Sequence, residues 1–193
     1  MGISKEKVKK RALPFKMREV GSWDYTQLAQ DILKVDESLW FEDVSRQKTY
    51  KPHVNTNTLV IMWHRESLGD NTVGKLNERN YNLLSFDNIL KSLKPVYSNF
   101  FGDGIFLRVL ITRLKPNTTI PRHTDGGKSL MTAKRTHLPL QLNEGTVFHV
   151  AGEDFHHELG KIYELNNAKQ HGVTNDGDKY RINLIIDYLP FDK

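Results

Sequence analysis

The sequence predicts a mainly β protein that folds as a jelly roll, with N-terminal helices packed outside it. After Phe100 the chain consists of short β-like runs, separated by segments rich in Gly, Asn, Asp and Pro. This spacing is typical of an antiparallel sandwich or barrel rather than of parallel βαβ units. An apolar run at 57–63 raises the number of expected strands to eight, as in a cupin-like double-stranded β-helix. The runs after Phe100 are 105–114, 118–124, 135–142, 146–150, 161–165, 169–174 and 180–188.

The first hundred residues have a mixed pattern that predicts helices as well as the strand. Ser22 can cap a helix whose apolar residues, from Trp23 to Leu33, recur at helical spacing. Residues 70–82 are polar and predict a loop. A second helix is expected over 86–93, with Ser85 as its cap and Pro95 as its limit.

Length and charge predict one domain with a basic arm. The chain has 193 residues, 38% of them hydrophobic, which suits a single globular domain. Residues 1–20 hold seven Lys or Arg against two Glu, which equals the net charge of +5 of the whole chain. We therefore expect an arm over 1–20 and one jelly-roll domain over 21–193, with support from 21–100 and a catalytic core at 101–193. The arm is expected to be solvated; nucleic acid is a possible but less favoured partner, because no aromatic residues interleave with the charges.

Several classes of protein are excluded by what the sequence lacks. No run approaches the roughly 18 apolar residues of a membrane span, and no apolar signal core follows Met1. The chain has no cysteine, which excludes disulfides, cysteine zinc sites and a thiol nucleophile, and suits a reducing cytoplasm. Any metal must therefore be held by His, Asp or Glu.

His123, Asp125 and His171 form the most informative group. On a strand, residues i and i+2 point the same way, so His123 and Asp125 face one point if the strand continues that far. His171 lies on another expected strand, and a jelly roll can bring the two strands together. Two His and one carboxylate are typical of non-haem Fe(II) oxygenases, although zinc can use the same ligands. The alternative is three histidine and acid side chains that hold no metal.

Further polar residues lie on neighbouring expected strands. Arg135 and His137 share one strand face, and Arg181 begins the last strand, which is mostly apolar. A buried Arg is costly without an anionic partner, and a carboxylate binds it in bidentate fashion. The partner could also be internal, for instance Asp187. The adjacent His156 and His157 are expected at the surface or in a loop rather than as ligands.

The C-terminal half resembles the aspartyl/asparaginyl β-hydroxylase family, which are Fe(II)- and 2-oxoglutarate-dependent oxygenases with a double-stranded β-helix. The order, spacing and flanking residues agree together over about the last 85 residues, from Ile105 onward. The runs that carry this resemblance are 119–125 (TIPRHTD), 135–140 (RTHLPL), 171–175 (HGVTN) and 180–187 (YRINLIID).

The resemblance implies roles for individual residues. His123, Asp125 and His171 would be the iron ligands. Arg181, with the hydroxyl of Thr112, would bind the distal carboxylate of 2-oxoglutarate. The residues near the end of 2-oxoglutarate that chelates iron would be Arg135 and His137. The animal enzyme of the family lacks the acidic ligand, whereas this chain has Asp125.

The implied function is a 2-oxoglutarate-dependent dioxygenase that uses Fe(II), 2-oxoglutarate and O2 to hydroxylate an unactivated C–H bond. The expected substrate is an Asp or Asn residue in a protein or peptide. Two alternatives stay open: a hydroxylase of a free amino acid such as proline, and a cupin-like protein that binds a small anion or metal without catalysis.

Overall fold

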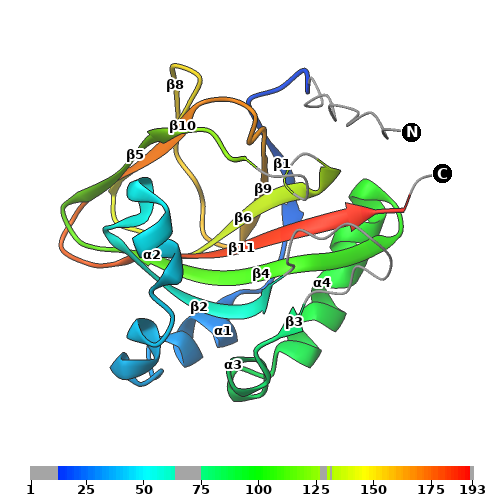
Figure 1. Cartoon of the computed structure of the whole chain (residues 1–193). Coiled ribbons are helices and arrows are strands. Elements are labelled where there is room, and N and C mark those ends of the chain that lie inside the picture. The colour runs from blue at the N-terminus through cyan, green and yellow to red at the C-terminus, as the bar shows by residue number, and fades with distance from the viewer. Residues whose placement is uncertain (1–12, 64–74, 127–129, 131, 192–193) are drawn as a thin grey trace, which may run out of the picture.

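Two antiparallel sheets face each other in the computed structural model, which describes residues 13–63, 75–126, 130 and 132–191 (Figure 1). The larger sheet has the order β1-β9-β6-β11-β4-β2-β3 and the smaller sheet the order β5-β10-β7-β8. The strands are β1 (Met17–Ser22), β2 (Thr56–Trp63), β3 (Lys75–Leu76), β4 (Gly104–Leu114), β5 (Thr118–His123), β6 (Lys134–Gln141), β7 (Gly145–Val150), β8 (Glu153–Phe155), β9 (Lys161–Leu165), β10 (His171–Asp176) and β11 (Arg181–Pro190).

Strands β4 to β11 have the order of an eight-stranded jelly roll. β4, β6, β9 and β11 lie in the larger sheet, and β5, β7, β8 and β10 form the smaller one. The prediction of a mainly β jelly roll is therefore confirmed, but the assignment of one of its eight strands is wrong. The run at 57–63 is the strand β2, which pairs with the outer side of β4 and extends the larger sheet. The eighth strand of the jelly roll is β8, whose three residues lie in a polar, turn-rich segment without a strand pattern.

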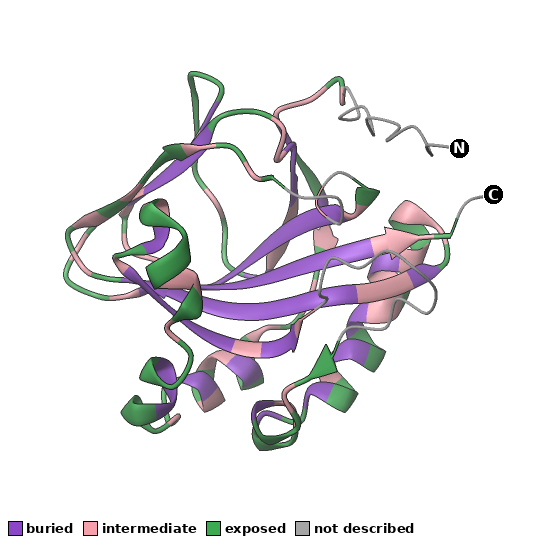
Figure 2. Ribbon diagram, in the orientation of Figure 1, coloured by how far each residue is buried: buried purple, intermediate pink, exposed green. Residues whose placement is uncertain are grey.

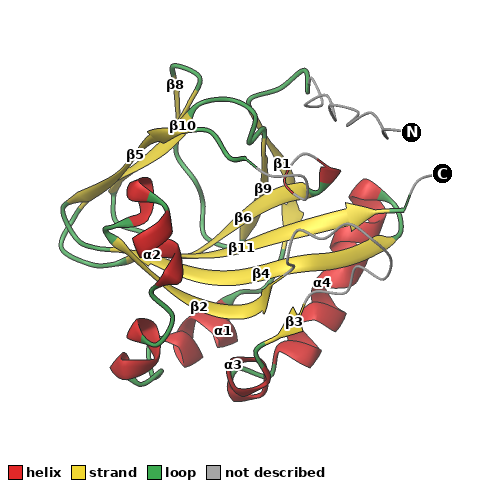
Figure 3. Ribbon diagram, in the orientation of Figure 1, coloured by secondary structure: helices red, strands yellow, loops and turns green. Residues whose placement is uncertain are grey.

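The helices are α1 (Thr26–Ile32), α2 (Ser45–Thr49), α3 (Glu78–Leu83) and α4 (Phe86–Phe101), with 3-10 turns η1 (Glu37–Phe41) and η2 (Lys51–His53). α1 and α4 lie against the face of the larger sheet that points away from the smaller sheet (Figure 3). No helix among the described residues is long and apolar enough to cross a membrane.

The main core lies between these helices and the larger sheet, whose strands are largely buried (Figure 2). On β11, Ile182, Leu184 and Ile186 point into this core together with Leu93 and Tyr97 of α4. The alternate residues of β11 point toward the smaller sheet, because successive side chains of a strand face opposite ways. The space between the sheets is therefore lined by the polar residues of the same strand.

A second, smaller core lies between the sheets. It contains Met17 of β1, Leu114 of β4, Phe148 of β7 and Val173 of β10. These residues hold the two sheets together at one end of the jelly roll, so that the polar side chains between the sheets have a fixed frame.

The structure corrects three predictions for the N-terminal half. Ser22 is the last residue of β1 and caps no helix; α1 begins at Thr26, whose N–H donates to Asp24. α4 continues through Pro95 to Phe101, because buried side chains on both sides of the proline pack on the sheet. Residues 75–82, expected as loop, contain β3 and most of α3, whereas 70–74 lie outside the described residues.

The basic segment 1–20 is divided in the structure. Residues 1–12 lie outside the described residues. β1 begins at Met17 and pairs antiparallel with β9, so residues 17–20 belong to the larger sheet. Arg18, one of the seven basic residues, forms an ion pair with the buried Glu164 of β9 at 2.6 Å.

Candidate active site

His123, Asp125 and His171 converge between the two sheets. β5 ends with His123, β10 begins with His171, and the antiparallel pairing of these strands places the two histidines directly opposite each other. One ligand atom from each of the three residues lies within 4.8 Å of the others, and they form the one such group found among the described residues. The structure therefore brings together the three residues that the sequence selected.

Asp125 reaches this position in a different way from the one expected. β5 ends at His123, so Asp125 lies in the segment that follows the strand. Its N–H donates to the carbonyl of Asn167 at 3.2 Å, which ties this segment to the one that follows β9. The carboxylate oxygens lie 3.8 Å from Nε2 of His123 and 3.9 Å from Nε2 of His171.

Backbone carbonyls orient both imidazoles. Nδ1 of His123 lies 2.8 Å from the carbonyl of Pro121, and Nδ1 of His171 lies 2.9 Å from that of Lys169. Because each carbonyl can only accept, each Nδ1 carries the proton and donates it. Both Nε2 atoms are therefore left with a free lone pair, which is the form that ligates a metal.

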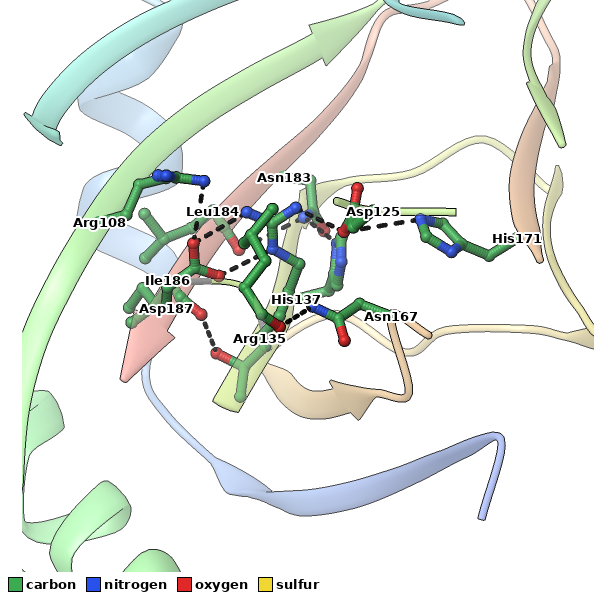
Figure 4. A network of polar contacts seen from close by, with 12 residues as sticks. Arg108, Asp125, Arg135, His137, Asn167, His171, Asn183, Leu184, Ile186 and Asp187 are labelled. Atoms are coloured by element: carbon green, nitrogen blue, oxygen red, sulfur yellow. Dashed lines mark hydrogen bonds and ion pairs between the residues drawn. The ribbon is translucent and has the colours of Figure 1, made fainter. Parts of the chain in front are cut away.

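A buried chain of charges holds the carboxylate of Asp125 (Figure 4). Nη1 of Arg135 donates to Asp125 at 2.6 Å, while Nε and Nη2 donate to the two oxygens of Asp187 at 2.7 and 2.8 Å. Arg108 lies 3.4 Å from Asp187 on the far side. Burial alone would raise the pKa of Asp125, but Arg135 and the two histidines outweigh it and bring the pKa to about 2. Asp125 is therefore ionised and fixed in place, as a metal ligand must be.

Close contact between the strands accompanies the histidine pair. The pairing of β10 with β5 shifts register just after His171, at Gly172. A Cβ atom at Gly172 would lie 2.7 Å from the carbonyl oxygen of Ile120, closer than real Cβ contacts. Glycine is thus required here for the approach that sets the two imidazoles opposite each other.

Arg181 is buried without an anionic partner. Its side chain points between the sheets, the residue is 3% exposed, and Nε and Nη2 have no hydrogen-bond partner. The alternative partner Asp187 is bound by Arg135 and Arg108 instead, and no ion pair of Arg181 occurs among the described residues. Burial lowers the pKa of Arg181 to about 10, so the guanidinium is charged at neutral pH. A buried and unpaired charge is costly, which makes this position suitable for the carboxylate of a ligand.

Thr112 and His137 lie on the same inner face of the larger sheet and line a narrow cavity together with His123, Asp125 and His171. Thr112 lies opposite Asn183 on the neighbouring β11 and donates to its carbonyl at 3.4 Å. Nδ1 of His137 accepts from the amide of Asn183 at 3.1 Å, whereas its Nε2 has no partner. Burial, followed by Arg181, lowers the pKa of His137 well below its usual value, so Nε2 is an unused neutral donor. Unpaired donors of Arg181 and His137 fit a dicarboxylic ligand.

His157 is more enclosed than its expected surface or loop position suggests. It does lie in a loop, but its ring stacks on Tyr163 at 4.2 Å and on Phe148 at 5.1 Å between centroids. Burial, together with Arg181, lowers the pKa of His157 to about 3. The preceding His156 is exposed, as expected.

The sequence reasoning missed Arg46 and His53, which come from the N-terminal half. A cavity of about 550 Å³ is lined by both of them, by Trp63, and by His123 and Asp125. α2 and η2, which carry Arg46 and His53, lie close to β5 and to β2 (Figure 1). No local pattern marks these residues, because they come close to His123 and Asp125 only through the packing of α2 and η2 on the jelly roll.

The comparisons with known proteins agree with this geometry. Residues 24–190 match the family model described as aspartyl/asparaginyl beta-hydroxylase. The match therefore begins well before Ile105 and includes α1, α2 and α4. A search of curated proteins found no match to this chain.

Several solved structures resemble this chain in fold. A 2OG-Fe(II) oxygenase family protein from Burkholderia pseudomallei gives a TM-score of 0.54 at 18% identity over 71% of this chain and 67% of that one. AviO1 from Streptomyces viridochromogenes gives a TM-score of 0.56 at 13% identity, over 90% of this chain and 89% of that one. A viral collagen prolyl hydroxylase from Paramecium Bursaria Chlorella virus-1, in a 2OG complex, gives a TM-score of 0.51 at 10% identity, over 93% of this chain and 98% of that one. At these identities the likeness concerns the fold.

Proposed function

This chain belongs to the aspartyl/asparaginyl β-hydroxylase family and is a 2-oxoglutarate-dependent hydroxylase, and we propose that it hydroxylates an Asp or Asn residue of a protein or peptide. Its cofactors are Fe(II) and 2-oxoglutarate. When bound, these groups activate O2 for the oxidation of an unactivated C–H bond, while 2-oxoglutarate is converted to succinate and CO2. The remaining chemistry concerns how the protein positions and encloses them.

His123, Asp125 and His171 are proposed to hold Fe(II). The observation that carries this proposal is the convergence of their ligand atoms within 4.8 Å, with both Nδ1 atoms tied to carbonyls. Two His and one carboxylate leave three adjacent positions open on an octahedral ion. Arg135 is proposed as a positioning residue, because it holds one oxygen of Asp125 while Asp187 holds Arg135.

Arg181 is proposed to bind the distal carboxylate of 2-oxoglutarate, with the hydroxyl of Thr112 beside it. The burial of Arg181 without a counter-ion supports this role. His137 and Arg135 would lie near the end that chelates iron, where Nε2 of His137 offers a donor. The apolar walls from Phe148 and Ile185 limit the access of water to this part of the site.

The size of the space next to the ligands favours a peptide over a free amino acid. The cavity that reaches His123 has a volume of about 550 Å³, and an adjoining cavity of about 590 Å³ shares Arg46, Thr49, Tyr50 and Trp63 with it. Each is in the range of roughly 300–1,000 Å³ that holds a drug-sized ligand. A free amino acid such as proline would fill a small part of this space, whereas several residues of a peptide would fill both cavities.

The first experiment compares wild type with His123→Ala. Addition of Fe(II) and 2-oxoglutarate without oxygen should give a weak visible charge-transfer band, and succinate should form slowly in air. His123→Ala should show neither, because two ligands do not hold Fe(II) in such a site. Mass spectrometry of peptides treated with each protein should then find the gain of one oxygen atom on Asp or Asn with wild type alone.

Two other functions give different results in the same experiment. A cupin-like binding protein would form no succinate, and a hydroxylase of a free amino acid would oxidise that amino acid rather than the peptides.

Binding of nucleic acid through the basic arm would be sensitive to salt and would disappear when residues 1–12 are deleted. A cytoplasmic location is proposed because the chain has no cysteine.

A further inference from the structure

We propose that Arg46 binds a carboxylate of the substrate, so that the enzyme selects an aspartyl over an asparaginyl side chain. This inference rests on the proposed function and deepens it, because the family description names both residue types without choosing between them.

Arg46 lies one imidazole away from a proposed iron ligand. Its Nη2 donates to Nε2 of His53 at 3.1 Å. The ring of His53 in turn packs edge-on against the ring of His123, with 5.2 Å between the centroids. Arg46 lines the cavity of about 550 Å³ that contains His123 and Asp125. A group bound to Arg46 would therefore lie in the substrate space close to the metal.

The guanidinium of Arg46 has donors to spare. It offers five N–H donors, and its hydrogen-bond partners among the described residues are two neutral groups: His53, and Thr58 Oγ1 at 3.4 Å. Asp43 also lines the adjoining cavity, but its Oδ1 accepts from the N–H and hydroxyl of Ser45. No ion pair of Arg46 occurs among the described residues. Burial and then repulsion from Arg135 lower the pKa of Arg46 to about 10, so it is charged at neutral pH and not neutralised.

The charges around the cavity also favour an anion. Among the described residues, its lining contains four cationic side chains and one carboxylate, and Asp187 lies behind the lining and binds two of the cations. Four positive and two negative charges leave a surplus of two, and the charges of Fe(II) and the 2-oxoglutarate dianion cancel each other. The residues counted are Arg46, Lys51, Arg108, Arg135, Asp125 and Asp187.

The geometry of the guanidinium explains why Arg46 should prefer an aspartyl carboxylate to an asparaginyl amide. A guanidinium donates two parallel hydrogen bonds to the two oxygens of a carboxylate. A side-chain amide has one oxygen, and its NH2 group would meet the N–H donors of Arg46 with no acceptor. Within a mostly buried site, the amide would leave donors unpaired and the surplus charge uncompensated.

The test uses wild type and three variants loaded with Fe(II) and 2-oxoglutarate. Arg46→Gln removes the charge, Arg46→Lys retains it without the fork, and Lys48→Gln is the matched control on the exposed face of the same helix. The probes are two degenerate peptide pools, identical except for Asp or Asn at the central position, and separately free L-aspartate and L-proline. The readout is succinate formed above the rate without probe, measured over a range of probe concentrations.

With wild type, the Asp pool should stimulate succinate formation at least tenfold more than the Asn pool. Arg46→Gln should remove this preference through a rise in the apparent KM for the Asp pool of about tenfold or more, as expected when one partner of a largely buried charge pair is lost. Arg46→Lys should recover part of it, and Lys48→Gln should behave like wild type.

The inference is wrong if the two pools act equally on wild type, if neither acts, or if Arg46→Gln keeps the preference. Stimulation by free amino acids alone would assign the carboxylate to an α-carboxyl group and overturn the aspartyl preference. The anaerobic charge-transfer band of wild type separates this failure from a failure of the proposed function. If the band is present, the metal and 2-oxoglutarate site stands and the substrate inference alone falls; if it is absent, the proposed function falls first.

Discussion

Arg135 and Arg181 are both buried on the inner face of the larger sheet, yet their surroundings differ. Arg135 donates to Asp125 and Asp187 through three hydrogen bonds of 2.6–2.8 Å. Arg181, on the neighbouring strand β11, has no acid at all within reach among the described residues. An arginine is therefore neutralised by internal carboxylates at position 135 and has no counter-ion at position 181. The difference indicates that Arg135 stabilises the folded protein, whereas Arg181 is available to bind an anionic ligand.

The largest expected effect is the loss of stability in Arg135→Met. Without the guanidinium, the buried Asp125 loses its arginine partner and the buried Asp187 retains only Arg108. Removal of one partner of a buried ion pair costs about 3–5 kcal/mol of unfolding free energy. Urea denaturation of the metal-free protein measures this. Arg113→Met is the control, because the carboxylate that Arg113 binds belongs to the exposed Glu37 and can return to water, so the loss should be smaller. Equal losses would contradict the comparison.

Arg181→Leu should have the opposite profile. The metal-free protein should be as stable as wild type or more stable, because an unpaired buried charge is replaced by an apolar side chain. Affinity for 2-oxoglutarate should fall by about 2 kcal/mol or more, roughly thirtyfold. Titration of the anaerobic charge-transfer band measures the affinity, and Arg181→Lys should lose less of it. Unchanged affinity in Arg181→Leu would remove Arg181 from the site.

Thr112→Val tests the proposed position of the distal carboxylate of 2-oxoglutarate beside Arg181. Valine has nearly the same shape but no hydroxyl, so it removes a proposed hydrogen bond to the ligand carboxylate. The expected weakening of 2-oxoglutarate binding is about 1.5 kcal/mol, roughly tenfold. The hydrogen bond from Thr112 to Asn183 is long, at 3.4 Å, so the stability of the metal-free protein should change little. An unchanged affinity would place the carboxylate elsewhere along β11.

The smallest effect concerns His157, next to Arg181. Burial lowers its pKa to about 3, whereas the unfolded chain binds the proton near pH 6.5. Because the unfolded state binds more protons, the stability present above pH 6.5 is lost as the pH falls toward 3. His157→Gln should therefore reduce the loss between pH 7 and pH 5 by about 1 kcal/mol, after allowance for partial exposure. Urea denaturation at both pH values measures this, and His156→Gln should leave the wild-type difference in place.

The sequence was sufficient where local pattern determines structure. Seven runs after Phe100 all contain strands, because alternating side chains and turn residues specify antiparallel strands locally. β8 was missed because three residues carry no periodicity. The prediction that the helix ends at Pro95 is wrong, because the burial of Leu93 and Tyr97 against the sheet outweighs the hydrogen bond that proline removes.

The candidate site was predictable to a different extent. His123 and Asp125 lie two residues apart, and His171 lies in a run that resembles a motif of the family, so the sequence alone predicts all three as one site. The structure brings their side chains together. The binding of Asp187 by Arg135, and not by Arg181, depends on the pairing of β6 with β11, in which these two residues are opposite each other. The sequence around Arg46 and His53 has no pattern that predicts a site, because only tertiary packing brings α2 and η2 close to the jelly roll.

The bare backbone at Gly172 limits how this centre can be redesigned. Even one added methyl group there would press on Ile120 and wedge the two strands apart, and the imidazoles would move with them. Metal affinity can thus be weakened without a change to any ligand. Variants intended to accept a larger ion should therefore change this glycine rather than the histidines, because Gly172 sets the separation of β5 and β10 and hence of the two imidazoles.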